Sequence, residues 1–293
     1  MDGKKLEILM TAVDLGSFSK ASEIVGYTQS GLTHLVDVLE REIGVQLITR
    51  SHSGISLTEA GKQLMPAIRE FLRANANLEN QIQAITEQKS ETIRIAAYSS
   101  IAMQWMPEIL YRFRRKSPDV TVDLRMVDHA LEPFELLEAG KTDVIFASRQ
   151  NYSFCEWIPL YDEKMMAILP KNYPLCGRTS FPLTEFSGKE FLMPYGRFDL
   201  DVQAAMDRVG VRLNATAAHV DDETVIRMVG KGLGVSMMTE LMIRGRTDDV
   251  LCVPVEPQAI RELGIGLPIC GKQSEGIRTL KECVLSFIRE MKK

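Results

Sequence analysis

Cysteine is scarce and scattered in this 293-residue sequence, which contains five cysteines and no pair with the C-x-x-C spacing. An odd number of widely separated cysteines favours neither a disulfide framework nor a zinc site, and we expect no metal or other cofactor. Free thiols are typical of a reducing compartment, so we expect a cytoplasmic protein. We expect these thiols to be buried and inert, and redox sensing by a single cysteine is the less favoured alternative.

Long apolar runs are also missing. No stretch of about 18 apolar residues, the length that would suggest a membrane span, occurs in the chain. The apolar segment near the N-terminus is interrupted by Glu7 and Asp14 and is followed by no A-x-A cleavage site, so we expect no signal peptide. Leu6, Leu9 and Val13 instead have the spacing of a helix that packs on a core. We therefore expect no membrane partner and set aside an exported solute receptor.

Catalytic motifs are absent too. The sequence contains no G-x-S-x-G, and none of its four histidines has a recognisable spacing to a nucleophile. We therefore expect a protein that is not an enzyme. A hydrolase-like enzyme or a metabolite-binding protein that uses a cleft is the alternative. Incubation with metabolites would separate these classes, because an enzyme turns its ligand over whereas a sensor only binds it.

What the sequence does contain is a helix-turn-helix pattern. Two short amphipathic segments are separated by a Gly-Tyr turn, and in the second the apolar residues follow i, i+3, i+4, i+7. Thr28 can cap the second helix, and the backbone N–H groups of its first turn offer a seat for a phosphate. The opposite face carries polar side chains suited to contacting DNA, namely Gln29, Ser30, Thr33 and His34.

The residues after Gly44 change to the spacing of strands. Val45–Ile48 and Ile55–Leu57 predict a small β-wing. Its tip carries Arg50 and His52, which we expect to contact DNA as well.

Four short motifs occur in register here: Gly16-Ser17-Phe18, Thr28-Gln29-Ser30-Gly31-Leu32-Thr33, the run from Leu39 to Arg50, and Leu57-Thr58-Glu59-Ala60-Gly61. Together they resemble the N-terminal region of LysR-type bacterial transcriptional regulators. The chain departs from the family pattern at Gly31, His34 and Ile48, and His34 could change which base or phosphate is contacted. The resemblance implies a winged helix-turn-helix domain that binds a double-stranded DNA operator, and it makes an ordinary helical hairpin the weaker interpretation.

Basic residues are few in the segment that would bind DNA. Residues 1–60 contain five Lys or Arg against eight acidic residues, whereas DNA-binding domains usually carry a basic surface. A dimer that focuses its few cations and its helix N-termini on one face could still bind phosphates. We therefore expect the affinity for DNA to depend strongly on oligomerisation.

Residues 59–90 show no strand signal and predict one long helix that a hinge at residues 89–91 closes. Its apolar residues recur with the 3-4-3-4 spacing of a coiled-coil seam, and one seam position is Asn, which costs stability but selects a register. A helix packed on its own domain is the alternative, although little nearby sequence could cover so long a stripe. We expect a homodimer, extended to a homotetramer through the C-terminal domains, with seam residues Leu64, Ile68, Phe71, Asn75, Leu78, Ile82 and Ile85.

From residue 92 onward, segments with strand spacing alternate with segments of helical spacing. This alternation predicts right-handed βαβ units, and weakly repeated helix-to-strand junctions suggest two similar lobes. The lobes resemble the effector-binding domain of LysR-type regulators, itself similar to periplasmic binding proteins. We therefore expect an α/β chain with a winged helix-turn-helix domain at 1–58, a linker and dimerisation helix at 59–90, and an effector-binding domain at 91–293, with lobe I at about 91–162 and 265–293 and lobe II at about 163–264.

Ligands of such folds bind between the lobes, at the carboxyl ends of strands and near helix N-termini. Ser99 and Ser100 precede a helix expected at Ile101–Lys116, so they could hold a carboxylate or merely cap that helix. Members of the family commonly sense small metabolites, often carboxylates, and we expect an anionic metabolite as effector. The candidate residues are Ser99, Ser100, Asp128, Ser148, Arg149, Tyr195 and Arg197, of which Asp128 and Arg197 could equally be solvated loop charges.

Overall fold

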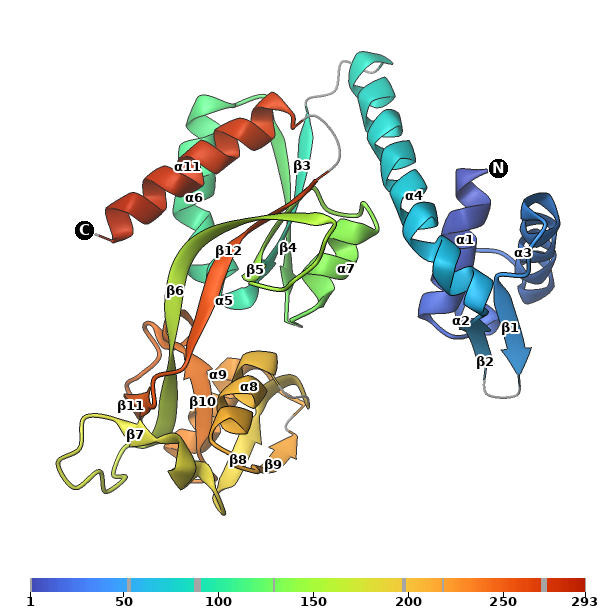
Figure 1. Ribbon diagram of the computed structural model, residues 1–293. Helices are drawn as coiled ribbons and strands as arrows, with labels where there is room; N and C mark the ends of the chain where they lie inside the picture. Colours follow the sequence, from blue (N-terminus) through green and yellow to red (C-terminus); the bar gives the residue numbers. More distant parts are fainter. Residues whose placement is uncertain are drawn as a thin grey trace. The chain divides into compact units, whose positions relative to one another are not determined.

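The computed structural model describes residues 2–51, 54–86, 91–128, 130–196, 199–217, 219–269 and 273–292. The chain divides into two compact units, the first formed by Met1–Lys89 with Glu138–Lys141 and the second by Ser90–Leu137 with Thr142–Lys293. Each unit has a buried apolar core of its own. Figure 1 follows the elements along the chain, from the blue helices of the first unit to the red C-terminal helix of the second.

The first unit consists of helices and one hairpin (Figure 1): α1 (Gly3–Asp14), α2 (Phe18–Val25), α3 (Gln29–Ile43), β1 (Ile48–Ser51), β2 (Gly54–Leu57) and α4 (Glu59–Thr86). Apolar residues of the first and third helices are buried where the spacing predicts, including Leu6, Leu9 and Leu32. Thr28 caps α3 by accepting a hydrogen bond from the backbone N–H of Gly31 at 3.1 Å. The predicted winged helix-turn-helix is therefore present.

The wing begins later than its sequence suggests. The expected strand from Val45 is a loop, and β1 starts at Ile48 and pairs antiparallel with β2. One carboxylate oxygen of Glu40 accepts hydrogen bonds from the backbone N–H of Leu47 at 2.7 Å and of Ile48 at 3.0 Å. Because Glu40 belongs to α3 and satisfies these two N–H groups, the loop between α3 and β1 needs no strand partner at this point.

The seam expected on α4 divides into a covered half and an exposed half. Ile68 is 6% exposed and belongs to the core of the first unit, where Leu64 and Phe71 also pack. The expectation that Ile68 meets a partner chain is corrected, because its own unit covers it, whereas Leu64 and Phe71 are half-buried. The exposed part of the seam holds Leu78 at 56% and Ile82 at 49%.

The other two seam positions lie in the same C-terminal half of α4. The side chain of Asn75 donates a hydrogen bond to Glu79 Oε1 at 2.9 Å, one turn further along the helix. The side chain of Ile85 lies outside the described residues, as does most of the expected hinge at 89–91.

Gly61 marks a close approach between α4 and the chain before the wing. A Cβ at this position would lie 2.1 Å from the carbonyl oxygen of Leu47. No side chain fits there unless one of the two backbones moves.

We expect Gly61→Ala to destabilise the first unit by about 1–3 kcal/mol through overpacking, although Ala is the better helix former. Thermal unfolding of the full chain measures the effect. The control is Lys62→Ala, one residue further along α4, where an exposed side chain predicts a change within about 0.5 kcal/mol. Equal or greater stability of Gly61→Ala would contradict the close approach.

The second unit is organised around an eight-stranded sheet with the order β4-β3-β5-β12-β6-β11-β7, to which β10 is added on β6. Its strands are β3 (Thr92–Tyr98), β4 (Thr121–Val127), β5 (Val144–Ser148), β6 (Cys155–Pro170), β7 (Phe181–Pro182), β10 (Ser236–Thr239), β11 (Val250–Glu256) and β12 (Ile260–Pro268). A separate parallel pair is formed by β8 (Glu190–Met193) and β9 (Asn214–Ala217).

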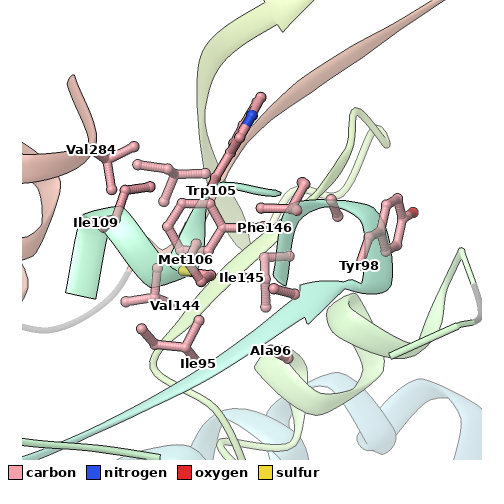
Figure 2. Close-up of a cluster of buried hydrophobic side chains, with 14 of the residues drawn as sticks. Ile95, Ala96, Tyr98, Trp105, Met106, Ile109, Val144, Ile145, Phe146 and Val284 are labelled. Carbon is pink, nitrogen blue, oxygen red and sulfur yellow. The ribbon is translucent and has the colours of Figure 1, made fainter. Parts of the chain in front are cut away.

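Helices cover these strands. They are α5 (Ser99–Gln104), α6 (Met106–Lys116), α7 (Glu132–Glu138), α8 (Leu200–Arg208), α9 (Asp222–Gly230), α10 (Glu240–Ile243) and α11 (Glu275–Met291), with short 3-10 turns η1 (Leu183–Phe186) and η2 (Pro194–Gly196). The first core gathers around β3, β5, α6 and α11 (Figure 2), and Trp105, Phe146 and Val284 lie within it. Two further apolar clusters fill the second lobe.

The strands β6 and β12 run side by side through both lobes (Figure 1). Residues 155–164 of β6 pair with β12, whereas residues 165–170 pair with β10 and β11. Sequence spacing did not predict β12, because glycines interrupt the alternation of its residues. Gly264 is required by packing, since a Cβ there would lie 2.5 Å from the Trp157 ring.

The single helix expected at Ile101–Lys116 is two helices. The first, α5, begins at Ser99, and α6 begins at Met106 after a break at Trp105. Pro107 lies in the first turn of α6 and has no backbone N–H to continue the hydrogen bonds of a preceding helix. The break leaves Ser99 and Ser100 at the start of a helix of only six residues.

Candidate functional site

A cavity of about 100 Å³ in the second unit is lined by residues of both lobes. On the same measure one water needs roughly 10–15 Å³, so the cavity has room for a small molecule or several waters. Tyr98, Ser99, Ser100 and Asp128 line it from the ends of β3 and β4. The second lobe contributes a methionine-rich apolar wall together with Tyr195 and three more aspartates.

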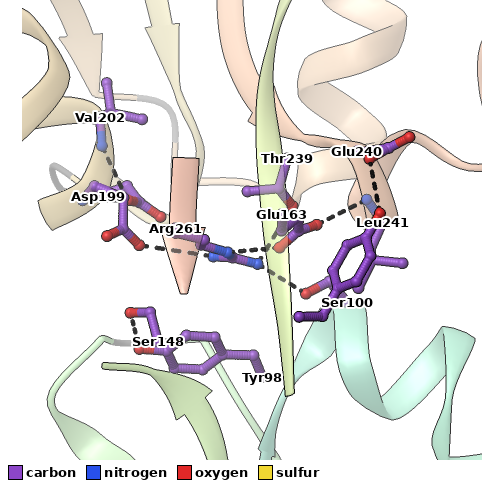
Figure 3. Close-up of polar contacts among 12 residues, drawn as sticks. Tyr98, Ser100, Ser148, Glu163, Asp199, Val202, Thr239, Glu240, Leu241 and Arg261 are labelled. Carbon is purple, nitrogen blue, oxygen red and sulfur yellow. Dashed lines mark hydrogen bonds and ion pairs between the residues drawn. The ribbon is translucent and has the colours of Figure 1, made fainter. Parts of the chain in front are cut away.

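Arg261 of β12 is the cation of this cavity among its described lining residues, and it is buried (Figure 3). Its Nε donates to Glu163 Oε2 of β6 at 2.7 Å, and the other oxygen of Glu163 accepts the backbone N–H of Leu241 at 2.8 Å. Its Nη2 donates to Ser100 Oγ at 3.0 Å and to Thr239 Oγ1 at 3.3 Å. Glu163 is 0% exposed, so the two charges neutralise each other away from water.

The two serines predicted to hold a carboxylate have different partners. Both are buried and both line the cavity. The Ser100 hydroxyl accepts the hydrogen bond from Arg261, whereas the hydroxyl of Ser99 has no hydrogen-bond partner among the described residues. Neither serine caps α5, whose N-cap is Tyr98. Ser99 is therefore the serine that can bind a ligand.

Tyr195 and Asp222 form a polar pair on the second lobe. The Tyr195 hydroxyl donates to Asp222 Oδ2 at 3.1 Å, and Asp222 is 8% exposed. Burial, with a smaller contribution from nearby Asp128, raises the pKa of Asp222 to about 6, although the Tyr195 hydrogen bond and Arg246 act to lower it. Burial and the neighbouring Asp199 likewise raise the pKa of Asp201 to about 6. The cavity thus holds carboxylates that lack a nearby cation strong enough to restore their usual pKa.

Two of the candidate residues lie outside the cavity lining. Ser148 is buried and shares a hydrogen bond of 3.2 Å with the Tyr98 hydroxyl, so it supports the lining from behind. Arg149 is exposed and forms an ion pair with Glu262 at 3.3 Å. The expectation that these two contact the effector is corrected, because their side chains are directed to protein partners. Arg197 lies outside the described residues.

The sequence pointed to four of the lining residues, namely Ser99, Ser100, Asp128 and Tyr195. It missed Tyr98, Asp199, Asp201, Asp222, Thr239 and Arg261. Asp222 is the first residue of α9, and Asp199 caps α8. The sequence shows an aspartate at the start of each helix, but ordinary helix caps have the same pattern. The charge balance also differs from the expected one, because a lining with four aspartates and one arginine does not favour an anion.

Three of the described cysteines follow the expectation of protected thiols, and Cys176 does not. Burial raises the pKa of Cys155 and of Cys252 to about 11, and Cys283 is buried. Cys176 is exposed, and Cys270 lies outside the described residues.

We expect the stability of the second unit to depend on the charge of Asp222. Its pKa is about 6 in the folded state and lower when unfolded, so the folded state holds the proton more tightly and stability falls as the pH rises toward 6. Asp222→Asn should therefore gain about 1–3 kcal/mol relative to the wild type at pH 8, and this gain should disappear near pH 4. Thermal unfolding at both pH values measures it. Asp207→Asn, an exposed residue of α8, is the control, and a pH-independent difference would contradict the burial of charge.

We expect Arg261→Met to destabilise the second unit by about 3–5 kcal/mol, because it leaves Glu163 buried without its partner. The double variant with Glu163→Gln should recover part of this loss, since Gln still accepts the Leu241 N–H and carries no charge. Unfolding of the wild type, both single variants and the double variant gives the coupling. Additive effects would show that the ion pair contributes nothing specific.

The face of α3 predicted to contact DNA is exposed at Gln29, Ser30 and His34, and Thr33 is half-buried. Arg50 lies in β1 and not at the tip of the wing. From β1 its guanidinium pairs with Asp37 and lies 5.3 Å from the centre of the Phe18 ring. The expected position of Arg50 at the tip of the wing is corrected, and its contact with DNA stays a prediction. His52 lies outside the described residues.

Two protein-family models match the chain, the bacterial regulatory helix-turn-helix protein of the lysR family over residues 4–62 and the LysR substrate binding domain over residues 86–288. The chain belongs to the LysR family. The Bacillus subtilis regulator YvbU, whose name describes it as uncharacterized, is 26% identical over 269 residues, which are 90% of this chain and 91% of YvbU.

Solved structures of LysR proteins share the fold. Full-length OxyR C199D from Pseudomonas aeruginosa has a TM-score of 0.63 and 21% identity, and the match covers 97% of this chain and 98% of OxyR. Full-length CbnR in complex with its target DNA has a TM-score of 0.58 and 18% identity, covering 98% of this chain and 100% of CbnR. This LysR-type transcriptional regulator therefore combines a DNA-binding helix-turn-helix with a two-lobed α/β effector-binding domain. None of its described helices is long and apolar enough to cross a membrane.

Proposed function

We propose that this LysR-type regulator binds a DNA operator and that a small molecule in the cavity between the lobes changes this binding. The observation that carries the proposal is the cavity itself, which is lined from both lobes and includes Ser99, a buried residue whose hydroxyl has no hydrogen-bond partner among the described residues. A ligand that contacts both lobes binds one arrangement of them better than another, and this difference is what shifts a conformational equilibrium.

The first unit would contact the operator through α3. Gln29, Ser30, Thr33 and His34 would lie toward the base edges or adjacent phosphates, with the N-terminal turn of α3 at a phosphate. CbnR, which shares the fold, has been solved with its target DNA. The pairing of Arg50 with Asp37 leaves the first unit with few available cations, which favours binding by more than one copy of the chain.

We propose a homodimer through the C-terminal half of α4 and a homotetramer through the second units. Leu78 and Ile82 are large apolar residues exposed on one helix, and they lie at the predicted seam spacing with Asn75 and Ile85. An exposed apolar stripe of this kind is stabilised when a second helix covers it. The proposed domain limits are 1–58, 59–90 and 91–293, with the two lobes dividing near residues 162 and 265.

We also propose that the chain is a cytoplasmic regulator and not an enzyme. The described residues that line the cavity include no histidine, cysteine or lysine. Among the described residues, no hydrogen bond joins the Ser99 hydroxyl to any of the lining aspartates, so none of these carboxylates is placed to activate it for nucleophilic attack. A ligand in this cavity would be bound and released without chemical change.

We expect Gln29→Ala to weaken binding of the preferred operator by about 1–3 kcal/mol and to relax the sequence preference at one position, because the amide can read a base edge. Selection of bound sequences from a random DNA pool with the full chain measures the preference. Thermal unfolding should remain unchanged, since Gln29 is exposed.

The matched control for this experiment is Glu7→Ala on the exposed face of α1, which should keep the preference of the wild type. An identical preference for Gln29→Ala and the wild type would remove Gln29 from the reading face. Failure of the wild type to enrich any sequence would refute the proposed function itself.

A further inference from the structure

The carboxylates of the cavity come from both lobes. Asp128 follows β4 in the first lobe, whereas Asp199, Asp201 and Asp222 belong to the second. We infer that the effector is a small organic cation, an aliphatic amine or guanidine, whose charged group binds between these carboxylates. This inference rests on the proposed function, which assigns the effector to this cavity.

Arg261 does not compensate for these carboxylates. Its charge is matched by Glu163, which lies behind the cavity lining and is fully buried. Its contact with the lining carboxylates is a weak one, 3.9 Å from Nη1 to Asp201 Oδ2. The charges of the described lining residues therefore sum to a negative value even when Arg261 is counted, and an anionic ligand would be repelled.

A second feature points to a ligand independently of the carboxylates. Ser99 lines the cavity, the residue is 7% exposed, and no described residue hydrogen-bonds to its hydroxyl. A group bound in the cavity can therefore supply the hydrogen bond that the protein does not. The Ser99 oxygen can accept a hydrogen bond from an ammonium or guanidinium N–H.

The arrangement of the acidic groups favours an organic cation over a metal ion. Within the described part of the chain, no three His, Cys, Asp or Glu residues come close enough together to hold a metal ion. The carboxylates are instead spread around a cavity whose other wall includes Phe191, Met193, Met237 and Met242. Flexible methionine side chains pack well against an alkyl chain, so the lining suits a cation that carries an aliphatic body.

The raised pKa values of Asp201 and Asp222 agree with this assignment. Asp222 is buried and Asp201 is half-buried, and each has a second carboxylate as an unfavourable neighbour, Asp199 for Asp201 and Asp128 for Asp222. A cation placed between such groups lowers their pKa and removes the repulsion.

Isothermal titration calorimetry on the full chain tests the inference with chain-matched probes. One series contains alkylamines, alkyldiamines and alkylguanidines of two to six carbons, and the other contains the mono- and dicarboxylates of the same lengths, all at pH 7.5. We expect saturable binding of at least one cation and weaker or no binding of the matched carboxylate. Equal binding of both series, tighter binding of the carboxylates or no binding of any cation would overturn the inference.

Variants place the binding in the cavity. Asp128→Asn and Asp222→Asn should each weaken the binding of the best cation by about ten- to a hundredfold, because each removes one charge-assisted hydrogen bond. Asp128 is exposed, so its replacement keeps the fold intact. The control is Asp207→Asn, an exposed acidic residue of α8 outside the lining, which should leave binding unchanged. Unchanged binding in both cavity variants would also overturn the inference.

Operator binding separates this inference from the proposed function. The affinity for the selected operator is measured with and without each bound probe. If a carboxylate binds and changes operator affinity, the cationic class is wrong while the proposed function holds. If a cation binds in the cavity and operator affinity does not change, the cavity is a cation-binding site and its role as the effector site is refuted.

Discussion

The buried ion pair between Arg261 and Glu163 is the contact on which the cavity depends. The two residues are direct partners on the neighbouring strands β12 and β6, which cross both lobes. Removing two charges from water costs several kcal/mol unless their hydrogen bonds are satisfied. Ser100, Thr239 and the Leu241 N–H satisfy them, so the pair draws α5, β10 and α10 to one point and fixes the surface that they present to a ligand.

The same ion pair affects the net charge of the residues that line the cavity. Because Glu163 neutralises Arg261, the described residues of the lining carry more negative than positive charge, and burial leaves two of the aspartates with a pKa of about 6. A buried charge without a partner costs free energy, which other interactions of the folded protein must offset. The carboxylates reduce the stability of the second unit near neutral pH, a cost that functional sites commonly carry.

Sequence patterns predicted the parts of this chain in which local chemistry is decisive. The caps and apolar spacing of α2 and α3 specify the helix-turn-helix without reference to distant residues. The strand β12 escaped prediction, because Gly264 is present for its close packing on Trp157 and not for strand propensity. Arg261 and Glu163 are 98 residues apart, and only the pairing of β6 with β12 brings them together. Ile68 of the α4 seam was misassigned for a similar reason, since its cover comes from α1 and other distant segments.

Under the proposed function, electrostatics would link the cavity to the operator without any contact between ligand and DNA. Repulsion between Asp128 of one lobe and Asp222 of the other opposes the approach of the two lobes. A cation bound between the two carboxylates would replace this repulsion by attraction. The first unit has few cations, so tight operator binding requires two copies to reach their half-sites at once, and this avidity is lost when their spacing does not fit. A ligand that changes the arrangement of the lobes therefore needs to alter only that spacing. Linkage then requires the operator to change the affinity for the ligand by the same factor.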